Sequence, residues 1–317
     1  MMTAANRIPP SVQKAVDQFQ SEADRILQPL VDKLKARTPP PIIYHYTGDV
    51  GLRGILETGR LWLTDVFSLN DPSELNHGFS LLLNALMDKA VSPDAKSFAQ
   101  GLVDFSKRVG IRRSGNFFVC SFSESGDDLG QWRAYGDNGR GYVLGFDTTE
   151  LETAFTKDGQ PGYAQASPLT YDDARLGDIH GQIVEKLFQL ISLPLSTTTV
   201  QAEWYTFLSL KALNAGLYFK HEAYRSEQEY RFLEAHPVDQ LVPGVKIRYR
   251  PYSLIRYREF DWRQVAPGAL KQIVIGPAAD RQKAHQFAGD CLRSFHSGNV
   301  KIGQSGIPYR AGDTNSA

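Results

Sequence analysis

The chain has little cysteine, no net charge and no long apolar run, and each absence excludes a class of protein. Two cysteines among 317 residues, Cys120 and Cys291, predict neither a disulfide framework nor a thiolate zinc site. Lysine and arginine total 35, as do aspartate and glutamate, so no net field attracts the chain to nucleic acid or to an anionic membrane. The longest apolar run, near Leu81, is far shorter than the roughly 20 residues that span a bilayer, and the N-terminus lacks a signal-peptide core. We therefore expect a soluble protein of the reducing cytoplasm, without a membrane partner.

Motifs of the common cofactor and hydrolase sites are also missing. The glycines 136, 139 and 141 form neither a G-x-G-x-x-G nor a G-x-x-x-x-G-K pattern, so a nucleotide would be held without the usual glycine cradle. The seven histidines, at positions 45, 77, 180, 221, 236, 285 and 296, are scattered without H-E-x-x-H spacing, and we expect no metal site. No G-x-S-x-G nucleophile elbow is present.

The pattern of apolar residues predicts an α+β fold. Apolar side chains at steps of three and four predict one amphipathic helix over 11–36, which Pro39-Pro40-Pro41 ends as a stiff linker. Because the later strands and helices are mixed rather than strictly alternating, we predict a mixed, mostly antiparallel split sheet. We expect an N-terminal helix and linker over 1–41, a single α+β domain over 42–310 and a loose tail over 311–317. The predicted strands of the sheet are 42–47, 117–123, 141–146, 229–234 and 271–276.

Two polar segments have ordinary structural explanations. Asn70-Asp71-Pro72-Ser73-Glu74 predicts a helix start in which Asp71 or Ser73 caps and Glu74 turns back to the first amides. The run from Arg248 to Arg258 alternates basic and aromatic residues, as single-strand nucleic-acid platforms do. A half-exposed strand gives the same alternation, so nucleic-acid contact is possible here but not favoured.

The most informative stretch holds two carboxylates, Glu227 and Glu229, two residues apart at the start of a predicted strand. Side chains two apart in a strand point to one face, and Arg225 and Arg231 would lie in phase beside them. Paired carboxylates suit general acid–base catalysis and transition states with oxocarbenium character. The alternative interpretation is a solvated strand edge with alternating charges.

A series of short motifs in order resembles a known family. These motifs are Tyr-His-Tyr-Thr at 44–47, Leu-Asn-Asp-Pro at 69–72, Cys-Ser-Phe-Ser-Glu at 120–124, Gln-Trp-x-x-Tyr-Gly at 131–136, Gly-Tyr-x-Leu-Gly-Phe-Asp at 141–147, Tyr-Arg-x-Glu-x-Glu-Tyr-Arg at 224–231 and Ile-x-Ile-Gly-Pro at 273–277. From about Ile42 to Arg310 the chain resembles the bacterial domain-of-unknown-function family 2971. That family has no settled activity, so the resemblance to it implies no function.

A weaker resemblance is to the ADP-ribosyltransferase superfamily, and it implies specific site residues. His45 matches the first-strand histidine, Ser121-Phe122-Ser123 resembles a Ser-Thr-Ser strand with Phe122 in place of Thr, and Glu229 takes the place of the catalytic glutamate. One branch of that superfamily has the histidine-type first motif and another has the Glu-x-Glu last motif. This chain combines the two, so the resemblance does not indicate which residue type would be modified.

The resemblance implies an NAD-dependent ADP-ribosyltransferase acting on a macromolecular acceptor, in a toxin or phage-defence setting and without a metal. Glu229 would be the catalytic carboxylate and Glu227 its acceptor-orienting neighbour. The cofactor-binding candidates are His45, Tyr46, Thr47, Asn70, Ser121, Ser123, Trp132 and Tyr135. The alternative is a non-catalytic module of the same fold that binds a nucleotide or a partner. The transferase requires Glu229 and His45 to face one cleft, whereas side chains on opposite faces favour the binding module.

Overall fold

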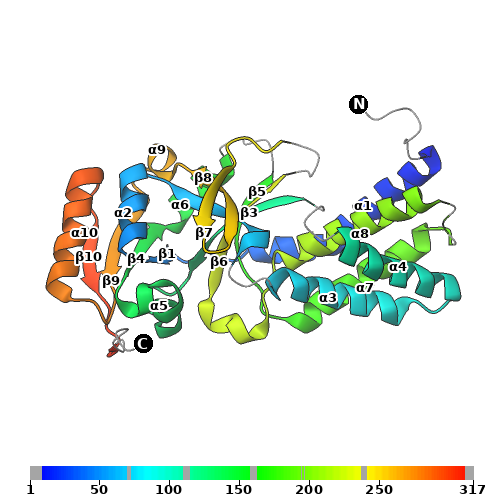
Figure 1. Cartoon of the computed structure of the whole chain (residues 1–317), viewed down its shortest axis with the longest axis horizontal. Coiled ribbons are helices and arrows are strands. Elements are labelled where there is room, and N and C mark those ends of the chain that lie inside the picture. Colours follow the sequence, from blue (N-terminus) through cyan, green and yellow to red (C-terminus); the bar gives the residue numbers. More distant parts are fainter. Residues whose placement is uncertain are drawn as a thin grey trace. The chain divides into compact units, whose positions relative to one another are not determined.

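The computed structural model describes residues 9–69, 73–109, 115–157, 163–193, 195, 197–236 and 241–310 (Figure 1). The side chains of 73–76 and 109 are outside this description. The chain forms two compact units. Unit 1 comprises Met1–Arg37, Leu69–Asn116 and Thr170–Glu222, and unit 2 comprises Thr38–Ser68, Phe117–Leu169 and Ala223–Ala317. The residues expected as one domain over 42–310 are thus divided between both units.

Unit 1 is built from helices packed on a common apolar core. Its long helices are α1 (Pro10–Lys35), α3 (Ser73–Lys89), α4 (Pro93–Val109), α7 (Asp173–Leu190) and α8 (Thr198–Gly216) (Figure 1). The predicted apolar stripe of α1 is confirmed: Val16, Phe19 and Leu30 are buried in this core. The helix lies outside the sheet, as predicted. No helix among the described residues is both long enough and apolar enough to cross a membrane.

The helix start predicted at 70–74 can be followed only in part. Helix α3 begins at Ser73. Asn70, Asp71 and Pro72 and the side chains of Ser73 and Glu74 lie outside the described residues. The capping roles of Asp71, Ser73 and Glu74, and the expected place of Asn70 in a cleft, therefore stay predictions.

Unit 2 carries an open ten-stranded sheet in which all five predicted strands occur. The main path of neighbouring strands is β10-β9-β4-β1-β3-β2-β8-β7, and β6 pairs with β3 and β5. The β9–β10 pair is parallel, whereas the other pairs with a described register are antiparallel. The strands are β1 (Ile42–Thr47), β2 (Leu61–Asp65), β3 (Asn116–Ser123), β4 (Tyr142–Asp147), β5 (Tyr163–Pro168), β6 (Glu229–His236), β7 (Lys246–Arg250), β8 (Ser253–Phe260), β9 (Leu270–Ile275) and β10 (Lys301–Gln304).

Strand β3 is the hub of this sheet, because it pairs with β1, β2 and β6. A strand has two edges, so one edge of β3 is shared between two partners. Near its end the backbone amide of Glu124 donates to the carbonyl of Gln228, 2.9 Å away, which ties the end of β3 to the start of β6.

The sheet has two faces with different cores. On the first, which we term the helix face, Ile43 and Leu144 pack with residues of α2 (Asp49–Thr58), α6 (Thr148–Lys157) and α10 (Arg281–Phe295). On the second, the tyrosine face, Tyr46 and Val143 pack with Trp132 of α5 (Leu129–Tyr135). Since side chains alternate along a strand, this division assigns every residue of β1 and β3 to one face.

Candidate functional site

The catalytic carboxylate expected at Glu229 lies at the first residue of β6, beside β3. The hydroxyl of Ser121 and the Nε of Arg231 both donate to Glu229 Oε1, each at 2.7 Å. The side chains of Glu229 and Arg231 are each only 4% exposed. Arg231 therefore lies beside Glu229, as the strand spacing predicts, and balances its charge within the protein.

Glu227 is not part of that strand, which corrects the expected strand pair. It ends a short 3-10 helix, Glu222–Glu227, and Gln228 then has a φ of 45°. A left-handed residue between the two glutamates breaks the two-residue alternation. Glu227 is instead held by Ser123, whose hydroxyl donates to its carbonyl at 2.8 Å, and by Tyr135, whose hydroxyl donates to Glu227 Oε1 at 3.3 Å. The two serines of β3 thus bring Glu227 and Glu229 together.

His45 and Thr47 lie on the other side of the sheet. Tyr44 pairs with Ser123, so Ser123 and Ser121 share the tyrosine face with Tyr46. His45 pairs with Leu144 and contacts the ring of Phe122 at 5.6 Å between centroids, which places it on the helix face. The expected cleft between His45 and Glu229 is therefore wrong for this structure.

The surroundings of His45 explain its orientation. Its Nδ1 donates to the carbonyl of Ser121 at 3.1 Å, while burial lowers its pKa more than this hydrogen bond raises it. Thr47 packs against α2, where an added Cβ on Gly51 would overlap the Thr47 hydroxyl. Both side chains are engaged within the helix-face packing.

Tyr46 and Trp132 share the tyrosine face with the carboxylates but are committed to its core. Their rings meet edge to face at 5.0 Å, and Trp132 is fully buried. The Tyr46 hydroxyl donates to the Ser125 carbonyl and accepts from the Asp128 amide, and burial raises its pKa. Of the aromatic candidates here, Tyr135 is the exposed one, at 42%. Of the described residues expected to hold NAD, His45 and Thr47 therefore lie on the helix face, whereas Tyr46, Ser121 and Ser123 lie on the tyrosine face.

A second cluster of polar and aromatic side chains lies in unit 2. The guanidinium of Arg248 on β7 lies over the ring of Trp62 on β2, 5.1 Å from its centroid. Its terminal nitrogen Nη2 donates to the Thr64 hydroxyl at 3.4 Å, whereas its buried Nε has no hydrogen-bond partner among the residues that the structure describes. Burial and the charge of Arg250 lower the pKa of Arg248. We term Trp62, Thr64, Arg248 and Arg250 the arginine–tryptophan cluster.

The sheet register places this cluster on one face. Lys246 and Thr64 both pair with Tyr257, and Arg248 and Arg250 follow Lys246 at steps of two. The nearby acid Glu259 is hydrogen-bonded by Arg60 and Lys246, so two cations already compensate it. The alternation of the basic and aromatic run thus collects guanidinium groups next to an indole ring that is 44% exposed.

Unit 1 contains a third group of polar side chains, which the sequence did not predict. His77, Asp173 and His221 place one donor atom each within 4.8 Å of the others. They are separated by 96 and 48 positions along the chain, so no spacing pattern could have shown them.

Residues 131–232 match a family model described as "Protein of unknown function (DUF2971)". The match supports the resemblance to that family. It covers about a third of the chain. No curated protein and no solved structure matches the chain.

The DUF2971 segment contains some of these groups and leaves out others. Trp132, Tyr135, Glu227 and Glu229 lie inside it, as do Asp173 and His221. The arginine–tryptophan cluster and the serines of β3 lie outside it.

Proposed function

We propose that unit 2 is a non-catalytic module that binds the phosphate and base of a nucleotide at the arginine–tryptophan cluster. The observation that carries this proposal is the buried Nε of Arg248, which has no hydrogen-bond partner in the described part of the chain, beside the charge of Arg250. A buried donor without a partner costs free energy, and two neighbouring guanidinium groups repel each other. A phosphate oxygen between the terminal nitrogens of the two guanidinium groups offsets their repulsion, and arginine is suited to phosphate recognition.

Aromatic side chains beside the cluster supply the second half of the ligand contact. Trp62 is 44% exposed, and Tyr252 in the turn between β7 and β8 is fully exposed. Stacking of a base on such a ring contributes about 1–3 kcal/mol. The ligand class is therefore an anion that carries a planar base, either a free nucleotide or a nucleotide of a single strand.

In this proposal the carboxylates stabilise the fold. Glu229 is almost fully buried, and both Ser121 and Arg231 donate to the same oxygen. A carboxylate that faces a developing cation has to reach the substrate. The placement of His45 on the helix face removes the expected nucleotide anchor from that neighbourhood.

The test is a titration of the full chain with AMP, with NAD and with a labelled oligothymidylate, followed by tryptophan fluorescence or anisotropy. We expect Arg248→Gln to weaken binding about tenfold, since one phosphate contact is lost. The slope of the logarithm of the binding constant against the logarithm of the salt concentration should become shallower by about 1. Arg293→Gln is the matched control, because this exposed arginine lies on α10 and pairs with Asp290. Equal affinities of the two variants for all three ligands would refute the proposal.

An NAD-consuming ADP-ribosyltransferase is the second candidate, and the hydrogen bond from Ser121 to Glu229 favours it. A hydroxyl that orients a carboxylate at 2.7 Å is suited to a site that stabilises positive charge. In that case Glu229 is the catalytic carboxylate, Glu227 orients a macromolecular acceptor, and Tyr135 is the aromatic side chain open to NAD.

Nicotinamide release from NAD separates the two candidates. A transferase predicts release that falls about 100-fold in Glu229→Gln, which corresponds to roughly 2.7 kcal/mol of barrier. Circular dichroism must show that this variant is folded, because the change also disturbs the contact with Arg231. If the wild-type protein releases no nicotinamide and its nucleotide binding depends on Arg248, the binding module is supported and the transferase is refuted.

A further inference from the structure

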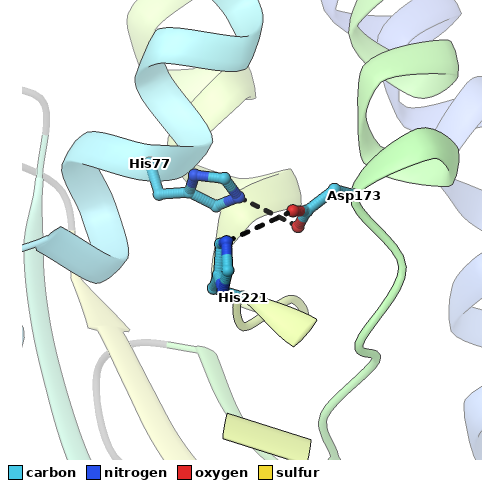
Figure 2. A group of neighbouring side chains, drawn as sticks. All are labelled: His77, Asp173 and His221. Carbon is cyan, nitrogen blue, oxygen red and sulfur yellow. Dashed lines mark hydrogen bonds and ion pairs between the residues drawn. The ribbon is translucent and has the colours of Figure 1, made fainter. Parts of the chain in front are cut away.

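We propose that unit 1 binds a divalent first-row transition metal through His77, Asp173 and His221. Figure 2 shows the three side chains directed toward one another from separate segments of the chain. Two imidazoles and one carboxylate are the donor set of open zinc sites and of non-haem iron sites. Such a site is independent of the proposed nucleotide site, because its residues all belong to unit 1.

The distances suit a metal ion. His77 Nε2 lies 2.9 Å from Asp173 Oδ1, and His221 Nε2 lies 3.9 Å from Asp173 Oδ2. Ligand atoms about 2.0–2.1 Å from a tetrahedral ion are separated by roughly 3.3 Å, a value between these two distances. The second distance is too long for a hydrogen bond, so the cluster is not a closed hydrogen-bonded triad. The two oxygens of Asp173 face different histidines (Figure 2).

The backbone holds the three ligands in place. The amide of Thr170 donates to the Tyr218 carbonyl at 2.8 Å, and the amide of Lys220 donates to the Thr170 carbonyl at 3.0 Å. This bridge fixes the segment before Asp173 against the segment before His221. Next to His77, an added Cβ on Gly78 would lie 3.5 Å from the Cα of Gly216, so α3 and the end of α8 approach closely at two glycines.

Asp173 is not needed to cap its own helix. Helix α7 is capped by Asp172, whose carboxylate accepts from the Arg175 amide at 2.9 Å. The carboxylate of Asp173 is therefore available to the histidines. An acid in the first turn is favourable by itself, but that preference does not explain two histidines from other segments beside it.

The site is accessible and has room for further ligands. The side chains of His77, Asp173 and His221 are 26%, 34% and 49% exposed. With three protein ligands, the remaining coordination positions are open to water or to a substrate. Imidazole nitrogens select transition metals over Mg²⁺ and Ca²⁺, which prefer oxygen ligands.

The experiment is a Zn²⁺ titration of the full, untagged chain by calorimetry, with metal content measured after dialysis. We expect one Zn²⁺ per chain and a thermal midpoint that rises with Zn²⁺. His77→Gln, Asp173→Asn and His221→Gln should each weaken binding about 100-fold or more, since loss of an outer-shell partner alone costs roughly 10- to 100-fold. Co²⁺ in place of Zn²⁺ should give visible absorption bands in the wild type that the three variants lack.

Two control variants separate this site from adventitious binding. Asp178→Asn changes an exposed carboxylate on the same helix, and His285→Gln changes an exposed histidine on α10. Both should bind Zn²⁺ like the wild type. No stoichiometric binding by the wild type would overturn the proposal. So would binding that all three ligand variants retain at wild-type strength, with circular dichroism showing them folded.

Discussion

Strand β6 in unit 2 and His180 in unit 1 bury titratable groups in different ways. In unit 2, β6 carries its buried charges in contact pairs: Arg231 Nε lies 2.7 Å from Glu229, and Arg258 Nε lies 2.7 Å from Glu234. In unit 1, His180 is fully buried within the helical core, among apolar side chains of α7. A strand keeps residues two apart on one face and beside its neighbours, so charges can pair at short range. The helix core surrounds His180 with apolar side chains, so burial favours its neutral imidazole.

The largest effect should follow from breaking a pair in unit 2. We expect Arg231→Met to lower the free energy of unfolding by about 3–5 kcal/mol, because it removes the cation that contacts the buried Glu229 carboxylate. Urea unfolding followed by circular dichroism measures this change. The double variant Glu229→Gln/Arg231→Met should recover most of the loss. If the double variant were as unstable as the single one, packing rather than charge would explain the effect.

The next effect concerns His180 in unit 1 and appears on acidification. Burial lowers its pKa from 6.5 to about 4 in the folded protein. Between these values the unfolded state binds more protons, so the free energy of unfolding rises with pH and falls as pH drops from 6.5 to 4. The total contribution is about 3 kcal/mol. The free energies of unfolding of the wild type and of His180→Leu, measured from pH 6.5 to pH 4, give the contribution of His180. If the two free energies changed equally with pH, the lowered pKa of His180 would be contradicted.

A smaller effect is expected at the end of α2 in unit 2. Gly59 has a φ of 70°, and an added Cβ would lie 2.5 Å from Arg263 Nε. We expect Gly59→Ala to cost about 1–2 kcal/mol for the left-handed backbone, and somewhat more if Arg263 is displaced. Arg263 donates to the carbonyl of Leu56 near the end of α2 and to that of Phe295 at the end of α10. Its movement would therefore weaken both hydrogen bonds. Thermal unfolding measures this loss, and a midpoint equal to that of the wild type would refute it.

The smallest effect should have the opposite sign and lies in unit 1. Gly177 lies inside α7, and an added Cβ would meet no described atom of the protein within 4 Å. Gly177→Ala should stabilise the protein by about 0.5–1 kcal/mol, because alanine loses less conformational freedom in a helix. The same unfolding measurement serves for this variant. Destabilisation would show that this part of α7 needs glycine for a reason other than backbone freedom.

The sequence predicted local structure well because its signals are local. The five expected strands and the amphipathic helix expected over 11–36 all depend on nearby residues. Strand β5 was not predicted, and it forms by pairing with β6. The two-unit division also escaped prediction, since each unit is assembled from three separate segments.

The candidate site shows the same limit. The contact between Ser121 and Glu229 agrees with the residues chosen from sequence, but the face of His45 depends on its pairing with Leu144. The break at Gln228 depends on one backbone angle. The group of His77, Asp173 and His221 results from helix packing and the Thr170–Phe219 bridge, which no single stretch of sequence encodes.

The interleaving of the two units has a consequence for biosynthesis. The chain passes from one unit to the other after residues 37, 68, 116, 169 and 222. Helix α1 packs on α7 and α8, so it leaves the ribosome long before its partners have been made. At about 5–20 residues per second, its apolar stripe would stay uncovered for roughly ten seconds or more. We therefore expect nascent chains that end before α8 to be the species that chaperones retain, and refolding of the full chain to be slow for its size.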